Sequence, residues 1–495
     1  MSLVRHKLNP ELLENGIAAV KKGRPVALVL SRPRDLIHEV CQKLLLSDQQ
    51  LRRMMVAMEK SMEKGLDRET ASTAAVRMLP SYVCAVPNGT ERGGFLALDL
   101  GGTNFRVLLI RLKEKEAEMT GKIFRVPENI MRGTGEALFD HIADCMAKFM
   151  QEHDLKDAQK LPLGFTFSFP CAQEGLTKGK LINWTKGFNA SGVEGADVVT
   201  LLREACQRRR DIDIDVVALL NDTVGTLMAC AFVENSCQIG VIVGTGTNAC
   251  YMERFDRISK ISDYVDEEGL VPEEMIINTE WGAFGDDGAM DFIRTEWDDV
   301  VDRQSINPGK QVFEKMISGM YMGEITRVVL EDLARQKLLF GGNFEAISRP
   351  HCFPTKYVSE IENELLEDED RTFQKTFQIL EDIGIETVSS NDCVNVAYVC
   401  SLGFRAAHLT AAGIAVLLNR MGKPFVTVGL DGSVYRFHPT YPKLLDEKIE
   451  QLVNKGLQYQ LMLSEDGSGR GAALVAAVAT RLKLEKLVAK LAASH

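Results

Sequence analysis

Three apolar runs in the sequence each end in a turn that combines glycine with hydroxyl or amide side chains. The turns are Gly101-Gly102-Thr103-Asn104, Gly244-Thr245-Gly246-Thr247-Asn248 and Gly432-Ser433. Glycine after a buried strand lets the backbone approach a ligand closely, so that successive N–H groups can converge on an anion. One such turn is usually only a turn. The first two share the order Gly-Thr-Asn, and Asp99 precedes the first, so together they favour a site for the phosphate chain of a nucleotide.

The better-known phosphate-binding signatures are absent from the sequence. A P-loop needs Gly-Lys followed by Ser or Thr, and no Gly-Lys pair here is followed by either residue. The protein-kinase signatures are also missing. Gly467-Ser468-Gly469-Arg470-Gly471 resembles a dinucleotide fingerprint, but its third glycine comes one position early. Its backbone could still cradle part of a nucleotide.

A carboxylate follows another apolar run, Val216 to Leu220, in the sequence Asn221-Asp222-Thr223. An Asp at the exit of a buried strand can project into the crevice where α/β proteins bind ligands. The alternative is a helix cap, a role that Asp and Asn commonly fill.

Amide and carboxylate side chains also occur among aromatic residues and glycines. They lie in Ser168-Phe169-Pro170, in Asn183-Trp184-Thr185-Lys186 and in Asn278-Thr279-Glu280-Trp281. A sugar site needs such groups, because they bind hydroxyls from within an apolar frame. A surface loop can have the same composition, so each segment alone leaves both interpretations open.

The elements that carry these residues are predicted to alternate between strands and helices, as in an α/β fold. Glu136 to Glu152 is one of the predicted helices. The runs before Gly101 and Gly244 recur about 145 residues apart, which is too far for a solenoid and indicates a duplicated α/β lobe. Earlier in the chain, Ser47 and Gln50 have the form of a capping box. Apolar residues at helical spacing then predict a core-facing helix up to Gly65.

Composition narrows the class of protein. The chain has 495 residues, of which 45% are hydrophobic and 26% charged, so we expect two to four compact units. The net charge of −11 argues against a nucleic-acid partner. Eleven scattered cysteines without a C-x-x-C pair favour a reducing compartment. We found no apolar stretch of about 18 residues, so we expect a cytoplasmic protein without a membrane span.

Taken together, these segments resemble the ATP-dependent hexokinase family, which includes glucokinase. The resemblance runs from about Pro80 to Ala479. Leu98 to Arg106 and Gly244 to Tyr251 are similar to the family's two phosphate-binding segments, and Gly429 to Tyr435 to its adenosine segment. Leu163 to Pro170 and Trp184 to Phe188 are similar to its sugar-binding signature.

The resemblance implies a two-lobed, actin-like (ribonuclease H-like) α/β ATPase fold with a sugar cleft between the lobes. It implies an N-terminal region at 16–220, with the small lobe mainly at 82–220. The C-terminal region would be 221–485, with its final helix returning to the small lobe. One catalytic unit per chain and a monomer are expected.

The same resemblance assigns the site residues. Glucose or a related hexose would be bound by Ser168, Thr185, Lys186, Asn221, Asp222, Asn278, Glu280 and Glu314. ATP would be bound by Asp99, Gly101, Gly102, Thr103, Asn104, Thr245, Gly246, Gly432, Ser433, Gly467 and Gly469. Met320 stands where glucokinase-like members have Lys, which leaves one nucleotide contact in doubt.

Phosphoryl transfer mainly requires alignment and charge neutralisation. Asp222 is the predicted base for the sugar 6-hydroxyl, and Lys186 would balance charge on the transferred group. Mg²⁺ would bridge the ATP phosphates without a dedicated protein cage. Two alternatives stay open: a non-catalytic sugar sensor or actin-like scaffold, and a kinase specific for another sugar.

Overall fold

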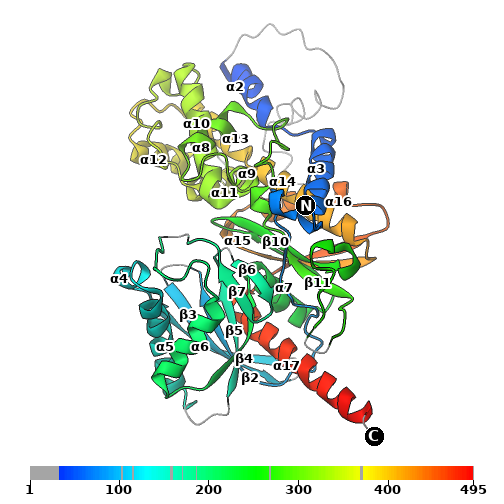
Figure 1. Cartoon of the computed structure of the whole chain (residues 1–495). Coiled ribbons are helices and arrows are strands. Elements are labelled where there is room, and N and C mark those ends of the chain that lie inside the picture. The colour runs from blue at the N-terminus through cyan, green and yellow to red at the C-terminus, as the bar shows by residue number, and fades with distance from the viewer. Residues whose placement is uncertain are drawn as a thin grey trace. The chain divides into compact units, whose positions relative to one another are not determined.

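The computed structural model describes residues 33–101, 104–113, 116–155, 160–169, 171–184, 187–266, 269–367, 372–465 and 467–493 (Figure 1). They form two compact units. The helical unit comprises the described residues up to Met54, Gly288–Ala412 and Phe437–Gln451. The two-sheet unit comprises Met55–Asp287, Gly413–Arg436 and the described residues from Leu452 onward.

The two-sheet unit contains two sheets with the same strand order. The first sheet runs β4-β3-β2-β5-β8, and the second runs β11-β10-β9-β12-β13, with the short β1 beyond β11. In each sheet, three consecutive strands form an antiparallel meander: β2, β3 and β4 in the first and β9, β10 and β11 in the second. The first strand of each meander also pairs in parallel with a later strand, which pairs in parallel with a further one. This shared order confirms the predicted duplication of an α/β lobe.

The bounds of the strands are as follows. The first sheet consists of β2 Gly93–Leu100, β3 Asn104–Lys113, β4 Glu116–Arg125, β5 Leu161–Phe167 and β8 Ile214–Leu220. The second consists of β1 Leu79–Pro80, β9 Cys237–Val243, β10 Thr247–Arg254, β11 Glu274–Asn278, β12 Phe425–Asp431 and β13 Gln458–Leu463. A separate hairpin is formed by β6 Cys171–Gly175 and β7 Lys178–Leu181.

Helices pack against both faces of the first sheet. Apolar residues of α5 Gly135–Glu152 and α6 Val198–Arg209 share one core cluster with β2, β3, β5 and β8. A second cluster joins the other face of that sheet to α7 Asp222–Val233, α17 Gly467–Ala493 and strands of the second sheet. α4 is the short helix Glu128–Met131. The helix predicted over Glu136 to Glu152 is confirmed as α5.

Glycine makes the contacts between α7, α17 and the strands unusually close. A β-carbon on Gly471 would lie 2.1 Å from the carbonyl oxygen of Gly225, so the two helices touch through their backbones. A β-carbon on Gly164 of β5 would lie 1.9 Å from the carbonyl oxygen of Ala472. No side chain fits at either position, so these glycines fix how α17 packs on α7 and on the first sheet.

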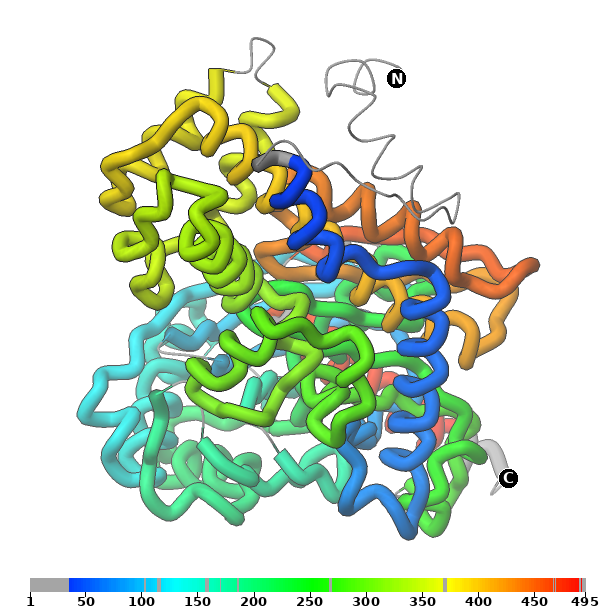
Figure 2. The backbone as a smooth tube through the Cα atoms, turned by 90° about the horizontal axis from the view of Figure 1, so that it is seen from above, coloured from blue at the N-terminus to red at the C-terminus, as the bar shows by residue number. Residues whose placement is uncertain are grey.

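The helical unit contains no strand within its described residues, and Figure 2 traces its main part in green to ochre. Its helices are α2 Pro33–Cys41, α8 Glu296–Gln304, α9 Val312–Ile317, α10 Gly319–Arg335, α11 Thr355–Glu367, α12 Gln374–Ile383, α13 Ser390–Ser401 and α16 Tyr441–Leu452. Four helices continue from one unit into the other: α3 Asp48–Leu66, α14 Phe404–Met421, α15 Ser433–Phe437 and α16, whose last residue, Leu452, belongs to the two-sheet unit.

The capping box predicted before α3 is confirmed. The Ser47 N–H donates to Gln50 Oε1 over 3.0 Å, and the Gln50 N–H donates to Ser47 Oγ over 3.2 Å. Leu51, Met54 and Met58 are buried, as the helical spacing of the apolar residues predicts.

One stretch, Ser390–Met421, is long and apolar enough to cross a membrane by length and composition, although the sequence analysis expected none. It consists of α13 and α14, which are separated at Leu402 and Gly403. Within its most apolar window, 78% of the residues are buried inside the protein. This burial is what the core helices of a globular unit show.

The helical unit buries a carboxylate beside an imidazole. Glu362 of α11 is 3% exposed, and its Oε2 accepts a hydrogen bond from the Thr440 hydroxyl over 2.6 Å. His438 Nε2 lies 3.8 Å from Glu362 Oε1. Burial raises the pKa of Glu362 to about 7 and lowers the pKa of His438 to about 4. The Cys400 thiol nearby is fully buried, and its pKa lies well above its usual value.

Candidate active site

The strands β2, β5 and β8 are neighbours in the first sheet, and a predicted site residue lies at the carboxyl end of each. Ser168 follows β5, and its N–H donates to the carbonyl of Leu100 over 3.1 Å. A β-carbon on Gly101 would lie 3.3 Å from the Ser168 hydroxyl and 3.9 Å from Oδ1 of Asp99. Asp99, Gly101 and Ser168 therefore meet at the edge of the sheet.

An ion pair to β3 holds the Asp99 carboxylate in place. Arg106 Nη2 lies 3.0 Å from Asp99 Oδ2, and only 12% of the Asp99 side chain is exposed. Asn104, the first residue of β3, is exposed and pairs with Arg125 of β4. Gly102 and Thr103 lie outside the described residues, so their predicted phosphate contacts stay predictions.

Asn221 and Asp222 follow β8, where α7 begins. Asn221 Oδ1 accepts from the Thr223 N–H at 3.0 Å and from the Thr223 hydroxyl at 2.8 Å. Asn221 is therefore the N-cap of α7. The sequence analysis considered this capping role as the alternative for Asp222, but Asn221 fills it. Asp222 is half-buried in the first turn of α7, the end of the helix at which a negative charge is stabilised. Burial, followed by the charge of Asp222, raises the pKa of Cys250 to about 12.

Aromatic rings support the loop beyond Ser168. The rings of Phe169 and Trp184 meet edge to face, with centroids 5.0 Å apart, and Trp184 stacks on Phe188 at 5.4 Å. Trp184 Nε1 donates to the carbonyl of Ala190 over 2.8 Å. These contacts fix both flanks of Thr185 and Lys186, which themselves lie outside the described residues.

Two amides converge on a carboxylate at the end of β11. Asn278 Nδ2 donates to Glu280 Oε1 over 2.7 Å, and Asn248 Nδ2 donates to the same oxygen over 3.1 Å and to Asn278 Oδ1 over 2.8 Å. Glu280 adopts a left-handed backbone conformation with φ +53°. The sequence analysis did not select Asn248 as a site residue. The signal was its place in the Gly-Thr-Asn ending of the second glycine turn.

The second glycine turn packs against the third. Gly244, Thr245 and Gly246 join β9 to β10, and Thr245 is exposed. Gly432 has φ +107°, and a β-carbon there would lie 2.4 Å from the Val243 carbonyl and 2.7 Å from the Gly244 nitrogen. Only glycine fits at position 432. Ser433 therefore begins α15 directly beside the β9–β10 turn.

The glycines at the start of α17 have a packing role. A β-carbon on Gly467 would lie 2.7 Å from Thr226 Oγ1 of α7, and one on Gly469 would lie 2.3 Å from Leu108 of β3. The Gly467 N–H donates to Asp431 Oδ2 over 3.4 Å. Close packing thus accounts for the spacing of these glycines, and their predicted contact with a nucleotide stays a prediction.

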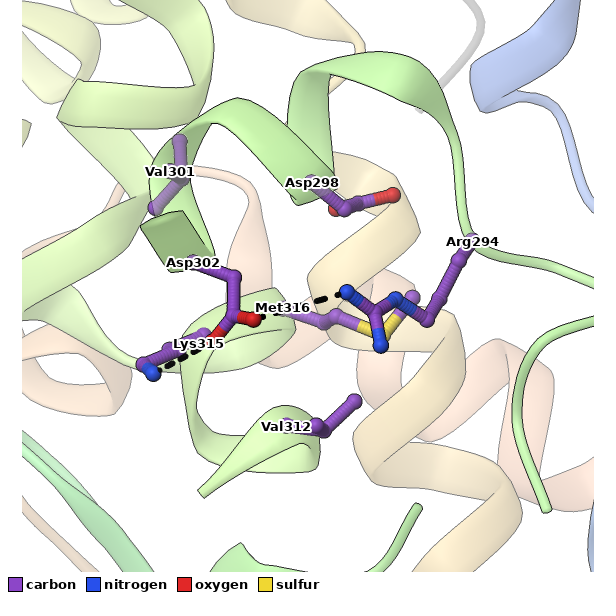
Figure 3. Close-up of a pocket in the computed structure, with 7 residues that line it drawn as sticks. All are labelled: Arg294, Asp298, Val301, Asp302, Val312, Lys315 and Met316. Atoms are coloured by element: carbon purple, nitrogen blue, oxygen red, sulfur yellow. Dashed lines mark hydrogen bonds and ion pairs between the residues drawn. The ribbon is translucent and has the colours of Figure 1, made fainter. Parts of the chain in front are cut away.

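Glu314 belongs to the helical unit, where an ionic clamp fixes its helix α9 (Figure 3). The ammonium of Lys315 donates to Asp302 Oδ1 over 2.6 Å, as Figure 3 shows. It also donates to the Asn307 carbonyl over 2.8 Å. The same carboxylate accepts the Gly309 N–H at 3.0 Å. Burial alone would raise the pKa of Asp302, but the hydrogen bonds from Lys315 and Gly309 outweigh it and lower the pKa. Glu314 itself is half-buried.

A groove of about 650 Å³ lies in the helical unit between α11 and Phe437, the last residue of α15. Its lining combines charged and polar side chains with the ring of Phe437, which is 73% exposed. Within the described ranges, no group of three or more His, Cys, Asp or Glu side chains is arranged to hold a metal ion.

Comparison with known proteins identifies the family. Family models described as hexokinase match residues 36–232 and 238–478. The chain belongs to the hexokinase family. It is 48% identical to human Hexokinase-2 over 461 residues, which are 90% of this chain and 49% of that protein. Rat Hexokinase-3 is 46% identical over 474 residues, which are 93% of this chain and 49% of that protein.

A solved hexokinase from Schistosoma mansoni, complexed with glucose, is 41% identical and superposes with a TM-score of 0.80. The match covers 90% of this chain and 99% of that one. The predicted fold class, the actin-like α/β fold of hexokinases, is thereby confirmed. This member of the hexokinase family spans about half the length of the curated relatives that it matches.

Proposed function

We propose that the chain is an active hexokinase. It transfers the γ-phosphoryl group of ATP to the 6-hydroxyl of glucose and related hexoses, giving hexose 6-phosphate and ADP, the first step of glycolysis. The observation that carries the proposal is that Asp99, Ser168 and Asp222 lie at the carboxyl ends of three neighbouring parallel strands, β2, β5 and β8. Ligands of α/β proteins bind at such carboxyl ends, and this chain belongs to the hexokinase family.

The sugar would be bound by hydroxyl, amide and carboxylate groups. Glu280 is oriented by two amide donors, as a carboxylate that accepts hydrogen bonds from sugar hydroxyls should be. Asn248 joins the predicted ligands on this ground. Ser168, Thr185, Lys186, Asn221 and Glu314 complete the proposed set. The glucose in the Schistosoma mansoni structure supports glucose as the substrate here.

Asp222 would act as the general base. It accepts the proton of the 6-hydroxyl as the oxygen attacks the γ-phosphorus, and the bond from that phosphorus to the bridging oxygen of ADP breaks. The transition state is loose, so the enzyme mainly aligns the reactants and offsets charge. Lys186 and backbone N–H groups of the glycine turns would neutralise the transferred group.

ATP would lie with its phosphates along Gly101 to Asn104, Thr245, Gly246 and Ser433. Asp99 and Asp222 are carboxylates of the kind that bind Mg²⁺ together with substrate phosphates. Bound Mg²⁺ would neutralise charge on the phosphate chain.

We further propose that the chain acts as a cytoplasmic monomer. Its N-terminal region would span 16–220, with the small lobe mainly at 82–220. Its C-terminal region would span 221–485 and return α17 to the small lobe. The sugar cleft would lie between the lobes.

The test is release of ADP from Mg·ATP with glucose, fructose, mannose, glucosamine or no sugar. A general base contributes about 10²–10⁴ in rate, so Asp222→Ala should lose at least 100-fold in sugar-dependent turnover. Asp213→Asn is a matched control, because Asp213 is exposed at the opposite end of β8 and should keep its turnover. Glucose binding without turnover in the wild type would instead identify a sugar sensor.

A further inference from the structure

The β9–β10 turn and the loop that carries Glu280 are joined by a buried hydrogen bond. Trp281 Nε1 donates to Thr247 Oγ1 over 3.1 Å, and the Thr247 hydroxyl donates in turn to the Ile242 carbonyl over 2.9 Å. Trp281 is 1% exposed and Thr247 is 5% exposed. Thr247 comes directly after Thr245 and Gly246, the proposed ATP-binding residues. Trp281 comes directly after Glu280, a proposed sugar-binding residue.

The backbone of Glu280 is held from both sides. On one side, the Thr279 hydroxyl donates to the Ala249 carbonyl over 2.7 Å and accepts from the Trp281 N–H over 3.2 Å. On the other, the indole of Trp281 is wedged against α14, where a β-carbon on Gly413 would lie 3.0 Å from Cζ3. A left-handed residue other than glycine is strained and persists only where its surroundings impose it. The hydrogen bond between Thr247 and Trp281 is one of the contacts that hold Glu280 in its left-handed conformation.

We propose that Thr247 is a positioning residue that couples the nucleotide site to the sugar site. Through the Trp281 indole, the position of the β9–β10 turn determines the position of the Glu280 carboxylate. Occupation of the turn by the phosphates of a nucleotide then favours the Glu280 position that binds sugar. Linkage requires the reverse effect to have the same size. This inference rests on the proposed function.

The experiment measures the dissociation constant of glucose by calorimetry, with and without a non-hydrolysable Mg·ATP analogue. The wild type should bind glucose more tightly with the analogue, and the analogue more tightly with glucose by the same factor. The coupling factor is the dissociation constant of glucose without the analogue divided by the one with it. Thr247→Val removes the hydroxyl and keeps the shape of the side chain, so this factor should fall about fivefold, which is the effect of one hydrogen bond. Thr247→Ser keeps the hydroxyl and should keep the factor.

A second variant guards against misfolding of Thr247→Val, which takes the Thr247 acceptor away from the buried indole N–H. Trp281→Phe removes the donor, and the Thr247 hydroxyl keeps its bond to Ile242. It should lower the factor equally, and the double variant should lower it no further. An unchanged factor in folded Trp281→Phe, or a wild-type factor of one, overturns the coupling. Wild-type protein without sugar-dependent ADP release overturns the proposed function itself, so the two failures are distinguishable.

Discussion

Replacing Glu362 with Gln should stabilise the helical unit above neutral pH. The pKa of Glu362 is raised by burial from 4.5 to about 7. A carboxyl group with a raised folded-state pKa contributes full stability below its unfolded pKa, and this contribution is lost as the pH rises through the folded pKa. Wild-type protein therefore loses stability between about pH 4.5 and 7, when the buried group ionises.

The size of the effect follows from that shift. A shift of about 2.5 units corresponds to about 3 kcal/mol at pH values where the carboxylate is ionised. Gln has nearly the same shape, and its Oε1 can still accept the Thr440 hydroxyl bond. The same variant should gain little at pH 5, where the folded carboxyl is protonated. His438 has a lowered pKa and loses stability as the pH falls below 6.5, but it does so in both proteins.

Calorimetric melting of wild type and Glu362→Gln at pH 5 and pH 8 measures the difference. About 3 kcal/mol in a unit of this size raises the melting temperature by roughly 6–12 °C. Glu367→Gln, at the exposed end of the same helix, is the control and should shift neither melt. An equal shift of Glu362→Gln at both pH values would refute the assignment of a buried, half-titrated carboxyl.

Two further substitutions test the clamp on α9 and the contact between α7 and α17. Asp302→Asn leaves the buried ammonium of Lys315 without its counter-charge, so the KM for glucose should rise at least tenfold, with a smaller change in kcat. Adding Lys315→Met should restore part of the loss, and a KM unchanged in Asp302→Asn would separate the clamp from sugar binding. Gly471→Ala should lower the melting temperature of the two-sheet unit, because its methyl would overlap the Gly225 backbone at 2.1 Å. A melt within 1 °C of wild type would contradict that packing.

The sequence predicted the parts of the fold that local patterns encode. The alternation of strands and helices and the capping box before α3 follow from local patterns, and the duplication follows from the recurrence of one such pattern. All three are confirmed. The fold class came from the family resemblance and is confirmed as well. The placement of Ser168 and Asp222 after neighbouring strands follows from how parallel strands end at one edge.

Features that depend on distant contacts were not predicted. Asn248 and Glu280 are 32 residues apart, and only the pairing of β10 with β11 brings them together. The left-handed backbone of Glu280 has no signal in its own residue type. The glycines of Gly467 to Gly471 suggested a nucleotide turn, but close packing of α17 on α7 also demands glycine there. A turn signature and a packing requirement look alike in a single sequence.

The position of α17 late in the chain matters when the protein is made. The strands β2, β5 and β8 are complete once residue 220 has been synthesised, yet the core on one of their faces is filled by Ala472 to Val478. At the usual pace of about 5–20 residues per second, the ribosome needs roughly 13–50 seconds to make the intervening residues. α7 follows β8 directly and can cover part of this face, but the part that Ala472 to Val478 cover stays exposed throughout that interval. Until α17 has been made, this exposed apolar surface makes the nascent chain prone to aggregation.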